Sequence, residues 1–240
     1  MSSRSRTATI AGVFYLITEV SAIAGLLLYQ PAFEAGYITG AGADSRVALG
    51  AVCEVILIVA NIGTIVTLYP VVKLQNESIA LGAVCARLLE AAMIGVGMLS
   101  VLAIVTLRQD GAAAGADSGS LVAVGQSLVA VHDWTFLVGP SIFLGIYSLL
   151  LAYLMYQSRL VPRAIAWLGL VGGPLVTLSA VAVLLGVYEP TTHAVSAIPV
   201  FAWEVSLGVY LIVKGFKVSP IKPTRAAPGL IAPASVPAGS

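Results

Sequence analysis

Residues 78–107 read SIALGAVCARLLEAAMIGVGMLSVLAIVTL, an apolar run long enough to cross a lipid bilayer as a helix. Arg87 and Glu90 stand near its middle, three residues apart and hence on one helical face. A charge in hydrocarbon costs about 2.5–3.5 kcal/mol on insertion scales, so it needs a partner within the protein. The run therefore predicts a membrane helix whose charged face packs against other helices.

The composition of the whole chain also indicates a membrane protein. Hydrophobic residues make up 59% and charged residues 10% of the sequence, with a mean hydropathy of +1.00, whereas a soluble domain has about 25% charged residues. The net charge is only +1, which argues against a nucleic-acid partner. We expect an all-α, polytopic transmembrane bundle whose main partner is the lipid bilayer.

Six apolar runs predict six helices in one membrane domain over residues 1–217. Residues 119–131 are too short to cross alone, so they are expected either to lie as an interfacial helix or to extend the fourth span. A kink is expected at Gly172-Gly173-Pro174. Five prolines predict a disordered tail over residues 218–240. The predicted helices are about 8–29, 47–72, 78–107, 134–156, 164–188 and 195–216.

The distribution of basic residues predicts the orientation. Six spans place both termini on one side of the membrane, and the basic residues outside the spans divide nine against two in favour of that side. The positive-inside rule then predicts cytoplasmic termini in a bacterial inner membrane. The nine are Arg4, Arg6, Lys73, Arg159, Arg163, Lys214, Lys217, Lys222 and Arg225, and the two are Arg46 and Arg108.

The expected partners of Arg87, besides Glu90, are three acids that each lie within another apolar run: Glu19, Glu54 and Glu204. Four acids around one arginine would carry a net charge of −3 if all were ionised, so we expect at least one acid to hold a proton near neutral pH. Asn61 lies about two turns from Glu54 on the same helical face. The candidate binding site is Arg87, Glu90, Glu19, Glu54, Glu204 and Asn61.

Three functions are compatible with this cluster. It could bind, sense or transport a small molecule, a proton or a cation; it could only tie helices together in a structural or accessory subunit; or it could serve a membrane enzyme that acts on a lipid-like substrate. The sequence contains no G-x-S-x-G, H-E-x-x-H or Walker motif. We therefore assign no catalytic residue and no cofactor, and the oligomeric state stays open.

The second candidate group is His132-Asp133-Trp134, at the expected outer start of the fourth span. The first interpretation is a polar helix start with Asp133 near the helix N-terminus and Trp134 in the aromatic belt. The alternative is a group for proton entry or for binding a metal, and His193 on the same side could share a site with it. Only these two histidines occur in the chain, so no histidine-rich metal site is expected. Cys53 and Cys85 are expected to be buried small hydrophobic residues.

Several short motifs, taken in their order and spacing, resemble the bacterial membrane family called domain of unknown function 4386. The resemblance covers roughly residues 4–217. It implies a six-helix inner-membrane protein and brings no established substrate or reaction. The motifs are Arg4-x-Arg6, Tyr69-Pro70-Val71-Val72-Lys73, Arg87-x-x-Glu90, Leu160-Val161-Pro162-Arg163, and Glu204 followed by Lys214-Gly215-Phe216.

Overall fold

The computed structural model describes residues 3–34, 36–40, 42–114, 117–189 and 193–217. Within these ranges the chain forms helices and no strand. Six segments are long and apolar enough to cross a membrane, and α4, η2 and α5 together make one of them. This confirms the all-α, six-span prediction. The elements are α1 (Ser3–Tyr29), η1 (Gln30–Phe33), α2 (Asp44–Val72), α3 (Glu77–Ala114), α4 (Ser118–Leu137), η2 (Val138–Phe143), α5 (Leu144–Ser158), α6 (Arg163–Leu184), η3 (Ala194–Ala197) and α8 (Ile198–Val213).

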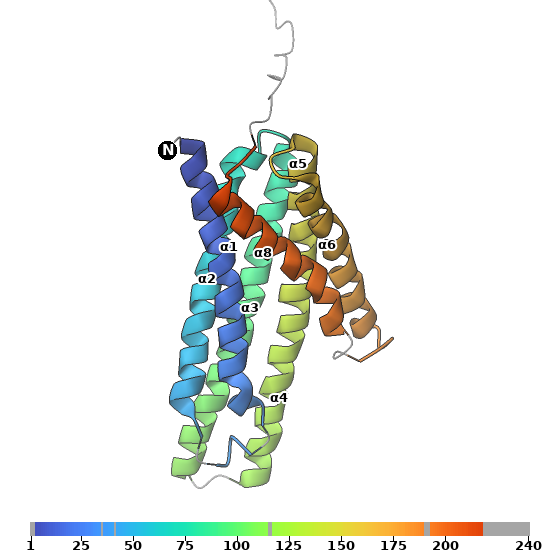
Figure 1. Ribbon diagram of the computed structural model, residues 1–240. Coiled ribbons are helices and arrows are strands. Elements are labelled where there is room, and N and C mark those ends of the chain that lie inside the picture. Colours follow the sequence, from blue (N-terminus) through green and yellow to red (C-terminus); the bar gives the residue numbers. More distant parts are fainter. Residues whose placement is uncertain (1–2, 35, 41, 115–116, 190–192, 218–240) are drawn as a thin grey trace, which may run out of the picture.

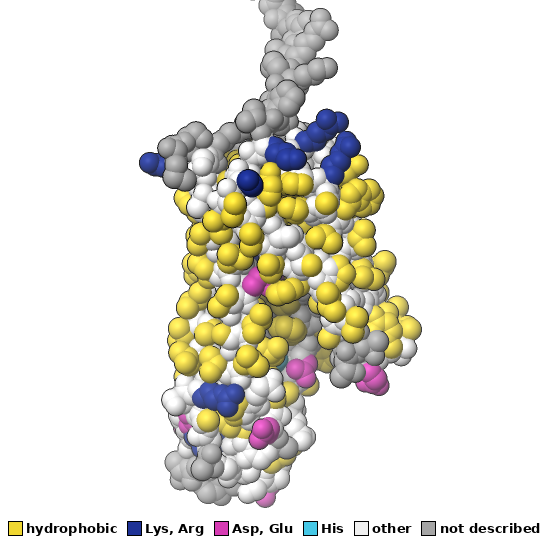
Figure 2. Space-filling model, viewed as in Figure 1, with side chains coloured by type: hydrophobic (Ala, Val, Ile, Leu, Met, Phe, Trp, Pro, Cys, Tyr) yellow, Lys and Arg dark blue, Asp and Glu magenta, His cyan; other side chains and the backbone are white. Residues whose placement is uncertain are grey.

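The helices form an elongated bundle (Figure 1). α1, α2, α3 and the continuous α4–α5 segment run along its long axis, whereas the shorter α6 and α8 cover only the half nearer the N-terminus. The C-terminal end of α8 lies at the same end of the bundle as the start of α1. On the face shown in Figure 2, Lys and Arg gather at this end, hydrophobic side chains cover the middle, and most Asp and Glu lie toward the other end.

The fourth span differs most from its predicted bounds. It begins at Ser118, so residues 119–131 extend the span and do not form a separate interfacial helix. The carboxylate of Asp117 caps this start by accepting a hydrogen bond from the backbone N–H of Ser120 at 2.8 Å. His132-Asp133-Trp134 therefore lies in the middle of a helix, and its interpretation as a helix start was wrong.

Other helix ends also differ from the prediction. α1 and α2 begin earlier than expected, and α3 continues past residue 107 to Ala114, where its alanines favour helix. α6 ends at Leu184 and not at 188, followed by Gly186 at φ 69°, a conformation that glycine adopts without steric cost. The last span begins with the 3₁₀ turn η3 and ends at Val213. The predicted disordered tail lies outside the described residues.

The fourth span contains an irregular turn. The six residues of η2, which include Pro140, form a π-helix, whereas α6 stays α-helical through Gly172-Gly173-Pro174, with Pro174 inside the helix, and the kink expected there stays a prediction. The two glycines of α6 serve close packing. A Cβ at Gly172 would lie 2.8 Å from the backbone N of Val200, and one at Gly173 would lie 2.5 Å from the carbonyl oxygen of Gly145.

The described residues form three apolar clusters, and the two largest make up most of the buried core. The larger one, in the half that α6 and α8 cover, centres on Tyr15, Tyr147 and Trp203, which are fully buried. The smaller one lies toward the other end of the bundle and includes Tyr29 and Ile104. Cys53 is half-buried and Cys85 is exposed on the apolar surface, so the expectation that both are buried was wrong.

Candidate functional site

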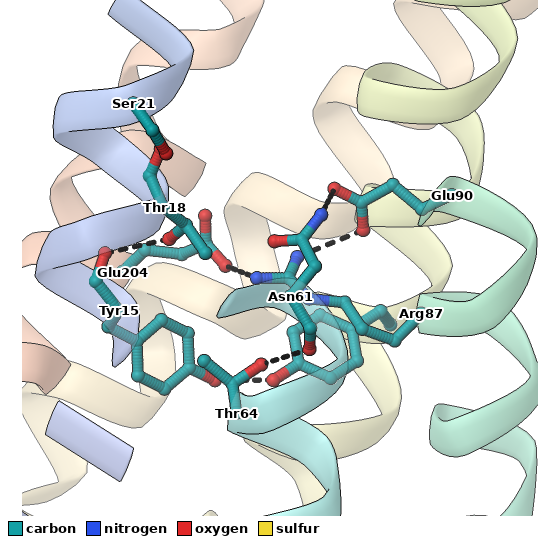
Figure 3. A network of polar contacts seen from close by, with 9 residues as sticks. Tyr15, Thr18, Ser21, Asn61, Thr64, Arg87, Glu90 and Glu204 are labelled. Atoms are coloured by element: carbon teal, nitrogen blue, oxygen red, sulfur yellow. Dashed lines mark hydrogen bonds and ion pairs between the residues drawn. The ribbon is translucent and has the colours of Figure 1, made fainter. Parts of the chain in front are cut away.

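Arg87 is the centre of a buried polar cluster between helices (Figure 3). Its side chain is 1% exposed. Nη1 donates to Oε2 of Glu90 at 2.9 Å, and Nη2 donates to Oε1 of Glu204 at 3.1 Å. The first bond stays within α3, while the second ties α3 to α8. One guanidinium thus supplies charge-assisted hydrogen bonds to two buried carboxyl groups.

Glu90 and Asn61 connect this centre to α2. The second carboxyl oxygen of Glu90 accepts a hydrogen bond from Nδ2 of Asn61 at 3.1 Å. Asn61 is 1% exposed, and its backbone carbonyl oxygen accepts a hydrogen bond from the Thr64 hydroxyl at 2.6 Å. The Glu90 carboxyl group is therefore held on both oxygens by side chains from two helices.

A wall of aromatic side chains covers the guanidinium of Arg87. Its Cζ lies 4.3 Å from the centroid of the Tyr147 ring, a cation–π distance. The hydroxyl of Tyr147 lies 2.5 Å from that of Tyr15. Trp203 packs edge-on against both rings with centroid distances of 6.2 Å. These three residues come from α1, α5 and α8, so the cluster lies among five helices in total.

Glu19 brings a third carboxyl group to the cluster. It is half-buried on α1, one turn after Tyr15. Its carboxyl group lies close enough to the Glu204 carboxyl group for the two to interact electrostatically. Thr18 and Ser21 beside it donate to carbonyl oxygens of α1 itself. If every group were ionised, Arg87 and the three acids would carry a net charge of −2.

Glu54 does not join this cluster. Its Oε2 accepts a hydrogen bond from the Tyr29 hydroxyl at 3.0 Å, and its described contacts include no member of the Arg87 cluster. Glu54 and Asn61 do lie on one face of α2, but about 10 Å apart along the helix. The six residues proposed as one site therefore separate into the Arg87 cluster and a second site around Glu54.

His132 belongs to the second site. It is 5% exposed and its ring packs against Tyr29, Phe33 and Phe136, while Nδ1 lies 3.4 Å from the Asp133 carboxyl group. The side chain of Asp133 is 69% exposed. His132 and Glu54 line the same cavity.

His193 has partners of its own. Its Nδ1 lies 2.9 Å from the Ser179 hydroxyl and its Nε2 lies 2.9 Å from the Ser141 hydroxyl. Burial lowers the pKa of His193, so the neutral ring is favoured. The two histidines share no contact in the described part of the chain. Within that part, no group of three or more His, Cys, Asp or Glu side chains is placed to hold a metal ion.

Comparison with known proteins places the chain in a family. No curated protein and no solved structure matches it. A family model described as "Domain of unknown function (DUF4386)" matches residues 10–215. The match includes every residue of the Arg87 cluster and of the second site, which agrees with the resemblance seen in the sequence motifs. The chain is therefore a multi-pass membrane protein that belongs to the DUF4386 family.

Proposed function

We propose that this protein acts in a bacterial inner membrane, with both termini in the cytoplasm, by binding and releasing a proton at the Arg87 cluster. Proton binding would serve to sense or transport a proton or another cation. The observation that carries the proposal is the presence of three carboxyl groups around one buried arginine. A net charge of −2 is unfavourable in a low dielectric, and protons or a cation remove it.

The neighbouring carboxyl groups of Glu19 and Glu204 are the preferred place for that proton. Ionised carboxylates only accept hydrogen bonds, so two adjacent carboxyl groups attract each other only when one carries a proton. Glu19 is half-buried, whereas Glu204 is 5% exposed. Glu19 is therefore the member of the pair that is better placed to exchange protons with its surroundings.

Protonation of this pair would also alter how α8 is held. α8 packs against α1 and α6, and the Arg87–Glu204 ion pair ties it to α3. Neutralising Glu204 weakens that ion pair, so that Glu90 remains the charged partner of Arg87. A change in proton occupancy thus becomes a change in the attachment of one helix, which is the kind of two-state element that a sensor or transporter requires.

Infrared spectroscopy of the purified protein in lipid vesicles tests the proposal. Protonated carboxyl groups have a carbonyl-stretch band that ionised groups lack. At neutral pH we expect this band in the unmodified protein, and we expect it to be lost or strongly reduced in Glu19→Gln. Glu189→Gln, an exposed acid outside the cluster, is the matched control and should keep the band.

The rival function is a purely structural tie between helices. The pairing of Arg87 with an acid on each side of its guanidinium favours that role. It predicts that a Glu19-dependent carboxyl band does not rise or fall between mildly acidic and alkaline pH, although Glu19→Gln would still alter stability. That result would refute proton binding at the cluster.

A further inference from the structure

The second site contains a cavity between α1, α2, α3 and α4. About 20 Å³ of its volume is open to the centre of a water molecule, which is room for one water. Its polar lining consists of Tyr29, Glu54, His132 and Thr135, and its remaining walls are mainly apolar. A water at this place would have polar partners on three of the four helices.

The polar groups of the cavity lead from the surface to the interior. Asp133 is exposed and its carboxyl group lies 3.4 Å from Nδ1 of His132. His132 and Glu54, which are 5% and 7% exposed, both face the cavity. The Thr135 hydroxyl donates to the carbonyl oxygen of His132, and the Tyr29 hydroxyl donates to Glu54. The ring nitrogens of His132 and the Glu54 carboxyl group are thus left as the sites that can exchange a proton.

The cavity also points toward the Arg87 cluster. Leu57 and Ile94 line it, and each lies four residues, or about one helical turn, from a cluster member: Leu57 from Asn61 and Ile94 from Glu90. Asn61 and Glu90 are bonded to each other. The cavity therefore lies about one helical turn from the cluster, on the side toward the acid-rich end of the molecule.

We propose that the Glu54–His132 cavity relays protons, by way of water, between the face opposite the termini and the Arg87 cluster. A proton taken up at one ring nitrogen of His132 leaves from the other to the water, which passes a proton to the Glu54 carboxylate. A second, transient water beside Leu57 and Ile94 then accepts the proton from Glu54 and donates one to a carboxylate of the cluster, which is thereby neutralised. Each transfer moves one proton and forms no covalent intermediate. This inference rests on proton binding at the cluster.

The titratable groups that face the relay are few. α1 supplies Tyr29, α2 supplies Glu54 with Cys53 beside it, and α4 supplies His132 and Asp133. α3 contributes only Ile94 and Gly97 to the lining. Within the described residues, no lysine or arginine lines the cavity, so the proton affinity of Glu54 depends on Tyr29, His132 and burial.

The rate at which the cluster takes up protons tests the relay. The Glu19-dependent carboxyl band is followed in time after a rapid change of pH on the face opposite the termini of vesicle-embedded protein. We expect Glu54→Gln and His132→Asn each to keep the amplitude of the band and to slow its appearance by about tenfold or more. Leu57→Phe, which fills the cavity without removing a titratable group, should also slow it. Glu189→Gln should leave the rate unchanged.

The outcomes separate the two proposals. If the unmodified protein lacks a Glu19-dependent band, proton binding at the cluster fails. If that band is present but its rate is unchanged in Glu54→Gln and His132→Asn, the relay fails and cluster binding stands. If the band is lost in Glu54→Gln and kept in Glu19→Gln, the signal belongs to Glu54 and both proposals fail. The amide band and gel filtration identify the folded variants. If one variant folds poorly, the other relay variants still test the proposal.

Discussion

At the scale of single residues, Arg87 is the group on which the buried cluster most depends. Replacing it in Arg87→Met keeps the volume of the side chain but leaves Glu90 and Glu204 without their cation. Breaking a buried ion pair from one side typically costs about 3–5 kcal/mol, because an uncompensated charge remains. We expect a loss of this size in the free energy of unfolding of the detergent-solubilised protein.

Arg46→Met is the matched control for this prediction. Arg46 is exposed and donates to the carbonyl oxygen of Leu27, so its removal should cost about 1 kcal/mol or less. Equal losses for Arg87→Met and Arg46→Met would mean that the cluster contributes nothing special to stability. A restored stability in Arg87→Met at acidic pH, where the acids are neutral, would support the stated cause.

The sequence predicted the charged members of the cluster but not its aromatic wall. Arg87, Glu90 and Glu204 were identifiable because a charge inside an apolar run demands a partner. Tyr15 and Tyr147 gave no such signal, since a tyrosine fits an apolar helix whether or not its hydroxyl is used. Glu54 was placed in the wrong group because residues that share a helical face can still lie at different depths in the bundle.

At the scale of helices, the contact between α1 and α8 determines how Glu19 meets Glu204. A Cβ at Gly12 would lie 2.6 Å from the carbonyl oxygen of Gly208, a backbone atom that cannot rotate away. We therefore expect Gly12→Ala to separate the two helices and to cost about 1–3 kcal/mol of stability. The measurement is the midpoint of thermal unfolding in detergent, together with the intensity of the Glu19-dependent carboxyl band.

Gly82→Ala makes the same chemical change at a more tolerant place. Its Cβ would meet only the Cδ1 of Leu150 at 3.2 Å, the end of a flexible side chain. Because alanine favours helix over glycine by up to about 1 kcal/mol, this variant should be neutral or slightly more stable. A destabilisation as large as that of Gly12→Ala would show that the close approach of α1 and α8 is not the cause.

The existence of the helices was predictable from the sequence, whereas several of their ends were not. Apolar runs mark where a helix crosses hydrocarbon. α3 continues beyond its most apolar part because its last alanines favour helix, and α4 begins early because Asp117 caps its start. The position of the π-helix at Val138–Phe143 was not predicted either. Pro140 and the Gly172-Gly173-Pro174 triplet are both unfavourable for a regular α-helix, and the packing around each determines how the helix is distorted there.

At the scale of the whole molecule, the bundle is longer than a bilayer is thick. α3 has 38 residues, which corresponds to about 57 Å at 1.5 Å per residue, against about 30 Å for the hydrocarbon core. α6 and α8 are shorter and lie near the end that carries the termini (Figure 1). We therefore expect the half that contains only α1–α4 to project furthest from the membrane, on the face from which the relay would take up protons.

This arrangement, together with the basic residues gathered at the end that carries the termini (Figure 2), predicts a definite topology. In a chain with Cys53→Ala and Cys85→Ala, single cysteines can be placed at Leu74, in the short turn before α3, and at Val187, after α6. Both positions are exposed, at 56% and 69%, and neither substitution changes a charge. A membrane-impermeant maleimide should label Val187→Cys in intact spheroplasts and label Leu74→Cys only after the membrane is opened. Labelling of Leu74→Cys in intact spheroplasts would place the termini outside, and the relay would then connect the cluster to the cytoplasm.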